Sequence, residues 1–306
     1  MKKSISYILF ILAIAPFFMT SCDKVEFPNI PIEGVDTSLY PGNFSEYTIP
    51  SFSENNNTLK NVLIEEFTGH LCGACPNAAI VAKNLEVENP GRVFAAAIHG
   101  GPSNNGLTGF HDIIPPKYDT DHTNPEGLEL ASTFFQLGVG FVALPRGGVN
   151  RRFNESGEFM FGPDDWAPLV SAELAEPVRI NLQAKSNYYS ETNGVFLHVE
   201  TDFEQSTEGT YNVVAYAIQN DRVDYQYFNE FGDSAYYHHH NVHVGNVFGE
   251  TWGRTVGSEE ITAGTKVVMD MSYKLPDGLS NEEMHFLILV YNRNTYKVEQ
   301  VIRHDF

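Results

Sequence analysis

The sequence predicts an α/β domain followed by an all-β sandwich domain, and three observations support this fold class. Between residues 59 and 176, apolar runs of strand type alternate with segments of helical periodicity, as in a sheet covered by helices. From residue 177 to 306 the helical segments stop, and segments of strand length alternate apolar and polar residues between turn-type residues. The third observation is a pair of cysteines placed between a predicted strand and a predicted helix.

The α/β part is expected to contain three strands and three helices. Residues 61–67 and 93–98 are short apolar runs, and the second is typical of a buried parallel strand. After the cysteine pair, apolar side chains recur at helical spacing, namely Ala78, Val81, Ala82 and Leu85. Two further helices are predicted over residues 126–137 and 163–174, with a strand over 147–151 between them.

An insertion, residues 100–125, interrupts this pattern. It is rich in Gly, Pro, Asn and Asp, and loops of this length inside a compact domain are usually functional. Titratable side chains in and beside it are candidates to line a cleft: His99, His111, Asp112, Asp119 and Asp121. The β part is predicted to contain strands over 178–184, 195–201, 211–219, 266–273 and 284–291.

The first residues indicate export and lipidation. Lys2 and Lys3 precede an apolar run over residues 7–18, which is typical of a secretory signal and too short to span a bilayer. The run ends in Met-Thr-Ser-Cys, which is similar to a bacterial lipobox, so residues 1–21 are interpreted as a lipoprotein signal peptide. Cys22 is then the site of acylation, including palmitate, and attaches the chain to a membrane. The alternative is an ordinary secretion signal with an incidental cysteine.

The remaining chain is strongly acidic. Removal of residues 1–21 takes away two lysines and leaves 17 basic side chains against 39 acidic ones, a formal charge of −22 (17 minus 39). Such a surface excludes nucleic acid as a partner, because phosphates require Lys and Arg. Residues 22–58 are rich in Pro, Ser, Asn and Gly and are interpreted as a lipidated tether, with room for one edge strand.

Cys72 and Cys75 are the two cysteines of the sequence besides the predicted lipidation site Cys22. A C-x-x-C between a strand and a helix is typical of a thioredoxin-like redox site. The unpaired amides and the dipole at a helix N-terminus favour a thiolate, so Cys72 is predicted to attack a substrate disulfide. Cys75, one turn further on, is predicted to resolve the mixed disulfide.

Three neighbouring segments strengthen this prediction. Glu66, at the inner end of the preceding strand, is expected to accept the proton of Cys75. Leu144-Pro145 has the features of a cis-proline loop, in which the backbone of Leu144 would pair with a substrate strand. His70 is expected to stabilise the thiolate when it is charged.

Other readings of the same residues stay open. Cys72 and Cys75 could form an inert disulfide, or half of a zinc site that lacks a second pair of ligands. His238, His239, His240 and His243 lie together, and in a strand the first and third face away from the second and fourth. Such a run is more often a polar loop or an edge strand than a metal site. No metal and no cofactor are therefore assigned.

The segment Glu65-Glu66-Phe67-Thr68-Gly69-His70-Leu71-Cys72-Gly73-Ala74-Cys75-Pro76 resembles the twenty-eight-kilodalton outer-membrane lipoprotein family. Residues 124–127 and 145–151 are similar to that family too. The resemblance implies a thioredoxin-like domain, a β-rich domain and an outer-membrane location facing the periplasm or the cell surface. Leu71 stands where thioredoxins carry Trp, which weighs against general thioredoxin-type reductase activity.

Three functions from different classes follow. The first is a lipid-anchored thiol–disulfide oxidoreductase that acts on envelope or surface proteins through Cys72 and Cys75. The second is a redox-inactive surface binding or adhesion lipoprotein that uses the β-sandwich or the 100–125 loop. The third is a structural partner of an outer-membrane assembly. An exposed Cys72 beside a cis Pro145 would favour the first function, and a buried Cys72 or a loop packed over the pair would favour the second.

Overall fold

A computed structural model describes residues 35–102 and 106–306. The predicted signal peptide, residues 1–21, and the predicted lipidation site Cys22 lie outside the described residues. The described residues belong to one compact unit. Within the described ranges, no helix is long and apolar enough to cross a membrane.

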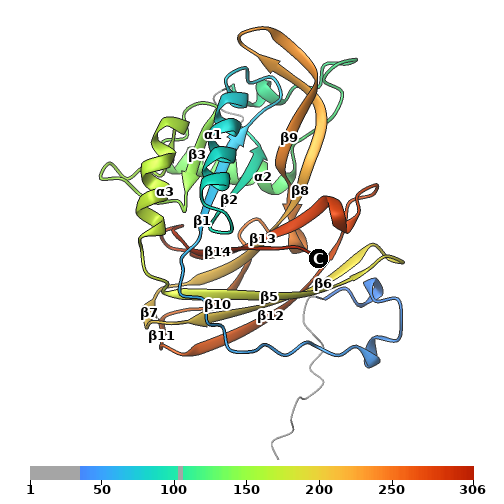
Figure 1. Ribbon diagram of the computed structural model, residues 1–306, viewed down its shortest axis with the longest axis vertical. Coiled ribbons are helices and arrows are strands. Elements are labelled where there is room, and N and C mark those ends of the chain that lie inside the picture. Colours follow the sequence, from blue (N-terminus) through green and yellow to red (C-terminus); the bar gives the residue numbers. More distant parts are fainter. Residues whose placement is uncertain (1–34, 103–105) are drawn as a thin grey trace, which may run out of the picture. The chain divides into compact units, whose positions relative to one another are not determined.

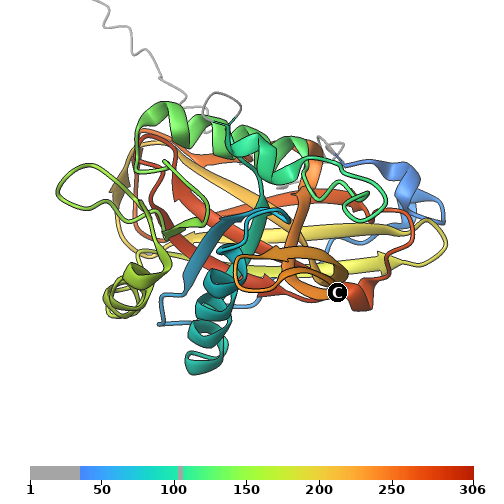
Figure 2. The same cartoon turned by 90° about the horizontal axis from the view of Figure 1, so that it is seen from above.

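The α/β part is a sheet covered by helices on both faces (Figure 2). Its elements are β1 (Val62–Thr68), α1 (Cys75–Glu88), β2 (Val93–His99), α2 (Pro125–Leu137), β3 (Arg146–Val149), β4 (Met160–Phe161) and α3 (Trp166–Leu174). β1 pairs in parallel with β2 and antiparallel with β3. One face of β1 packs on α1 and α3 through Val62 and Ile64, whereas Leu63 and Phe67 pack on α2. The same alternation places the adjacent Glu65 and Glu66 on opposite faces.

Local sequence explains where these helices begin and end. Pro76 stands in the first turn of α1, where its missing N–H costs nothing. The side chain of Asn124 accepts a hydrogen bond from Gly127 N and caps α2, which ends at Gly138 with a left-handed backbone (φ 69°). In the 100–125 insertion the described residues include a short 3₁₀ helix, Leu107–His111.

The β part contains the predicted sandwich. Its strands are β5 (Ile180–Tyr189), β6 (Gly194–Phe203), β7 (Thr207–Glu208), β8 (Tyr211–Phe228), β9 (Gly232–Asn246), β10 (Arg254–Gly257), β11 (Glu260–Ile261), β12 (Thr265–Lys274), β13 (Met284–Asn292) and β14 (Val298–His304). The three-stranded sheet β12-β6-β5 packs against β14, β13 and β8 through one apolar core (Figure 1). Leu197 and Val199 of β6 meet Phe286 and Ile288 of β13 in that core.

The two parts share one sheet. The strand order β14-β13-β8-β9-β2-β1-β3-β4 runs across both, and β9 pairs in parallel with β2 at Val242 and Ala97. Phe67 of the α/β part and Leu289 of the β part belong to one apolar core. The predicted border between residues 176 and 177 falls between α3 and β5, yet the sheet and its core continue across it.

Arg151 joins the two parts through a buried ion pair. Its guanidinium donates two hydrogen bonds of 2.7 Å to the Glu65 carboxylate and a third, of 2.9 Å, to Tyr216 of β8. The Tyr216 hydroxyl in turn donates to Glu65. Arg151 has a left-handed backbone (φ 48°), which a non-glycine residue seldom adopts. The network therefore fixes β1, the segment after β3 and β8 together.

The predicted tether needs a correction over its described residues, 35–58. This segment packs against the β5–β6 sheet and is not a free linker there. The ring of Tyr40 packs edge-on against Tyr189, and that of Tyr47 packs edge-on against Phe196. The Tyr47 hydroxyl lies 2.5 Å from His198 Nε2. No β-strand occurs within 35–58, where two 3₁₀ turns, Thr37–Leu39 and Phe44–Glu46, are found. Composition predicted a linker because it does not reveal that these aromatic rings cover the outer face of a sheet.

Candidate functional site

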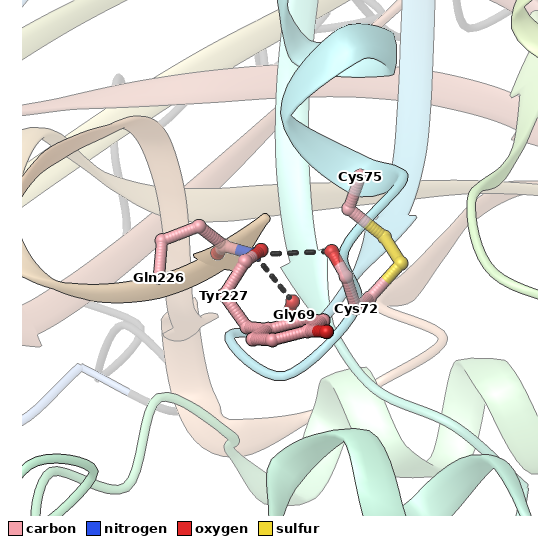
Figure 3. Close-up of a disulfide and its surroundings, with 5 residues drawn as sticks. All are labelled: Gly69, Cys72, Cys75, Gln226 and Tyr227. Carbon is pink, nitrogen blue, oxygen red and sulfur yellow. Dashed lines mark hydrogen bonds between the residues drawn. A yellow bond between two sulfur atoms is a disulfide. The ribbon is translucent and has the colours of Figure 1, made fainter. Parts of the chain in front are cut away.

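Cys72 and Cys75 form a disulfide at the N-terminus of α1 (Figure 3). Both are buried, with exposed fractions of 2% and 1%. Cys75 is the first residue of the helix, and its amide donates to the carbonyl of Cys72. The strand–loop–helix context that the sequence predicted for the pair is therefore present, whereas the exposed Cys72 expected of an exchange enzyme is not.

The β8–β9 hairpin covers the loop that carries the cysteines. The Gln226 side chain donates to the carbonyl of Cys72 at 3.0 Å and approaches that of Gly69 at 3.4 Å (Figure 3). The amides of Tyr227 and Asn229 donate to the carbonyls of His70 and Gly73 at 2.8 and 3.2 Å. The hairpin thus occupies four backbone carbonyl groups of the loop, those of Gly69, His70, Cys72 and Gly73.

Gly73 shows how closely the hairpin approaches. A Cβ atom at this position would lie 2.2 Å from Oδ1 of Asn229 and 2.8 Å from its backbone nitrogen. Because real Cβ atoms do not come that close to a backbone atom, only glycine fits under the hairpin. The glycine between the cysteines therefore makes room for the protein's own chain.

Glu66 is buried beneath α1. Its neighbours in the sheet are Ala97 and Gly147, and Oε1 has no hydrogen-bond partner within the described part of the chain. Burial, together with the nearby carboxylate of Glu86, raises the pKa of Glu66 to about 8. Glu66 lines a pocket of about 310 Å³ between α1 and β9, the α1–β9 pocket, and among the described residues neither cysteine lines it. Its predicted role as proton acceptor for Cys75 stays a prediction.

Leu144 and Pro145 are joined by a cis peptide bond. Arg146, the next residue, pairs with Phe67 at the end of β1, so this loop lies beside the segment that leads to the cysteines. Leu144 packs partly buried against the apolar core beneath α2. The predicted use of Leu144 as a dock for a substrate strand stays a prediction.

His70 belongs to a cluster of buried imidazoles, the histidine cluster, formed by His70, His99, His111, His122 and His239. The ring centroids of His99 and His122, and those of His122 and His239, are each 4.9 Å apart. His70 lies 5.4 Å from His122 and 6.5 Å from His111. Among the residues that the structure describes, neither ring nitrogen of His99 has a hydrogen-bond partner.

The cluster alters the surroundings expected for His70, whose predicted role at the thiolate stays a prediction. Its ring donates toward the carbonyl of Asp112 at 3.1 Å, and burial lowers its pKa. A lowered pKa disfavours the charged form that thiolate stabilisation requires. His99 and His111 also differ from expectation, since they are buried inside the cluster and do not line an open cleft.

The four histidines of β9 follow the predicted alternation along that strand. His239 and His243 are buried, whereas His238 and His240 are exposed and contact Asp221 at 2.7 and 3.2 Å. Within residues 35–102 and 106–306, no group of three or more His, Cys, Asp or Glu side chains is arranged to hold a metal ion.

Sequence reasoning missed the residues of β8 that complete this region. Asp224 lies 3.3 Å from His122, Arg222 lies 3.2 Å from the same ring, and Gln226 contacts the cysteine loop. The run of alternating polar and apolar residues after Gln219 could have extended the predicted strand. It could not have revealed that the strand returns to the α/β part.

The fold and site define a class of protein: an α/β unit with a closed disulfide at a helix N-terminus, continuous with a β-sandwich. No family model and no curated protein matches the sequence. Among solved structures the chain is similar to HBP35 of Porphyromonas gingivalis, with a TM-score of 0.61 at 18% identity over 82% of this chain and 77% of that one. A protein from Agrobacterium tumefaciens gives a TM-score of 0.50 at 12% identity, covering 79% and 93%. At these identities the likeness concerns the fold alone.

A domain of the outer membrane lipoprotein Omp28 from Porphyromonas gingivalis also matches part of the chain. The match covers 42% of this chain and 88% of that one at 19% identity, with a TM-score of 0.28. This score is too low to support an argument, so membership of the twenty-eight-kilodalton lipoprotein family is not shown.

Proposed function

We propose that this chain is a lipid-anchored envelope protein that binds its ligands on a thioredoxin-like scaffold, with the Cys72–Cys75 disulfide serving as a closed structural bond. The observation that carries the proposal is the β8–β9 hairpin, which covers the cysteine loop and leaves both cysteines buried. Disulfide exchange requires in-line attack on a sulfur atom, and a covered pair does not admit a protein thiolate.

The thioredoxin-like assignment rests on the order of elements around the disulfide. β1, the cysteine loop, α1 and the parallel strand β2 follow one another, and β3 begins directly after the cis Pro145. The outer-membrane location and the family resemblance rest on the lipobox at Cys22 and on the motif around Cys72. Radiolabelled palmitate supplied to cells should enter the wild-type chain and not the Cys22→Ala variant; equal labelling would contradict the anchor.

Thiol–disulfide exchange is the second candidate function. The position of the disulfide at the start of α1 and the cis bond at Pro145 favour it. It requires that the hairpin move away from the cysteine loop, so that Cys72 can be attacked.

The reduction potential of the disulfide separates the two functions. For a closed structural bond we expect a value below about −300 mV, whereas working oxidoreductases lie between about −270 and −120 mV. The full-length chain in detergent would be equilibrated with thiol–disulfide buffers and then alkylated. A value in the working range, with Cys72 alkylated before Cys75, would overturn the proposal and support exchange.

Substitution of the hairpin supplies the matched test. Gln226→Ala removes the hydrogen bond to the Cys72 carbonyl and should speed reduction of the disulfide by dithiothreitol, by about fivefold to tenfold for one lost hydrogen bond. Tyr236→Ala changes a side chain of the same hairpin that is 82% exposed and should leave the rate unchanged. Equal rates in all three proteins would show that the hairpin does not protect the disulfide.

A further inference from the structure

The α1–β9 pocket has a volume of about 310 Å³ and lies on the face of the sheet that α1 covers. Small side chains make the space: Ala79 and Ala82 of α1 face Ala95 and Ala97 of β2 across it. A volume of this order is that of a small-ligand site. Its other wall is β9.

The pocket lining contains a carboxyl oxygen that has no hydrogen-bond partner among the described residues. Glu66 is 3% exposed, and Oε1 accepts no hydrogen bond from the described residues. Buried polar atoms are nearly always paired, so an unpaired carboxyl oxygen beside an open volume points to a ligand that pairs with it.

A second carboxylate lies close by. Glu86 also lines the pocket and is held by hydrogen bonds from the amide of Ala95 at 2.7 Å and the side chain of Asn241 at 3.1 Å. Burial raises the pKa of Glu86, and its charge in turn helps to raise the pKa of Glu66. A cation placed between two carboxylates stabilises the ionised form of both.

Two cations of the chain, Arg303 and Lys83, act on Glu86 without forming an ion pair with it, and their charges partly offset the rise of its pKa. Within the described residues, no Lys or Arg side chain forms an ion pair with Glu66 or Glu86. Lys83, the one cationic side chain among the pocket residues, is turned to the exposed rim and lies 3.3 Å from His240. At the same rim Tyr236 and Tyr237 offer aromatic faces, which attract cations.

We propose that the α1–β9 pocket binds an organic cation of the size of a lysine or arginine side chain, with its charged group paired to Glu66 and Glu86 and its alkyl part between the tyrosines and the alanines. The proposal deepens the binding function proposed above and rests on it. The cation can belong to a free amine or to a side chain of a partner protein, because the same chemistry recognises both.

Calorimetric titration tests the proposal. The full-length chain in detergent would be titrated with agmatine and with cadaverine. Both amines should bind saturably, and 1,5-pentanediol, a neutral analogue of cadaverine, should not. Because Glu66 has to ionise to pair with the cation, binding at neutral pH should release protons. The measured heat should therefore differ between phosphate and Tris buffers. The other titratable or charged groups around Glu66 and Glu86 are Lys83, Tyr237, His238, His240 and Arg303, and Asp221 is paired with the two histidines.

Variants locate the site. Glu66→Gln and Glu86→Gln should each weaken agmatine binding by at least about tenfold, the loss expected for a charged hydrogen bond. Glu88→Gln, an exposed position on the same helix, is the matched control and should bind as the wild type does. Circular dichroism would show that each variant is folded, and Tyr236→Ala provides a surface variant that weakens binding without disturbing the core. The proposal fails if no saturable binding occurs, or if Glu66→Gln binds agmatine as tightly as the wild type.

Competition distinguishes the two sources of the cation. A short unstructured peptide with one central arginine should displace agmatine if the natural ligand is a protein side chain. If the peptide does not compete while agmatine binds, the site is one for a free amine. The reduction potential measured separately reports on the proposed closed disulfide, so failure of that proposal and failure of this one are told apart.

Discussion

Acidification from pH 7 to pH 5 should remove several kcal/mol from the free energy of unfolding, because the buried imidazoles of the histidine cluster take up protons when the chain unfolds. Burial holds the pKa of His111 and His239 at about 4 and that of His122 at about 3, and it lowers the pKa of His70 and His99 too. Neighbouring imidazoles lower these pKa values further, since adjacent positive charges repel.

The sign follows from proton binding. An unfolded histidine has a pKa of about 6.5, so below that pH the unfolded chain binds more protons than the folded one. The stability that depends on these imidazoles staying neutral is fully present above pH 6.5 and is lost as the pH falls toward about 4. Each group contributes up to about 1.4 kcal/mol per pH unit, and several together rival a total stability of about 5–15 kcal/mol. Glu66 acts in the opposite direction, because its raised pKa lowers stability as the pH rises toward about 8.

Urea unfolding at a series of pH values between 5 and 7.5 measures this dependence. His99→Leu removes one buried imidazole whose ring nitrogens have no hydrogen-bond partner among the described residues. It should reduce the slope of unfolding free energy against pH by up to about 1.4 kcal/mol per unit. His238→Gln, at an exposed position outside the cluster, should keep the wild-type slope. A stability that is constant from pH 7.5 to 5 would contradict the expected burial of neutral imidazoles.

Arg151→Ala should destabilise the chain by about 3–5 kcal/mol, because it leaves the buried Glu65 carboxylate without its ion-pair partner. The same change removes the hydrogen bond from Arg151 to Tyr216 and the stacking of the guanidinium on Phe134 and Tyr291, whose centroids are each 5.1 Å away. Since Glu65 lies on β1 and Tyr216 on β8, the loss should weaken the contact between the two parts of the shared sheet.

The midpoint of urea unfolding would measure the effect. Arg303→Ala removes an ion pair with Asp305 at the surface and should cost no more than about 1 kcal/mol. The double variant with Glu65→Ala should lose less than the sum of the two single losses, because the partners share one interaction. An Arg151→Ala protein as stable as Arg303→Ala would show that the buried pair contributes little.

Much of the local structure could be predicted from the sequence because it depends on neighbours along the chain. The apolar run of β1, the capping Asn124 and terminal Gly138 of α2, and the alternation of His239 and His243 against His238 and His240 all follow from such local rules. The position of Cys75 at the start of α1 and the cis bond at Pro145 were predicted in the same way.

Only the tertiary structure decided what surrounds these elements. The hairpin that carries Gln226 lies more than 150 residues after Cys72 and yet covers it, and no periodicity encodes such a contact. His99, His122 and His239 likewise come from three separate segments and meet because β9 pairs beside β2. The sequence by itself determined the strand and helix around the cysteine pair and the places of Glu66, Cys72, Cys75 and Pro145 along them. Burial, which sets both the access to the disulfide and the pKa values of Glu66 and the histidines, arises from long-range packing, and only the tertiary structure decided it.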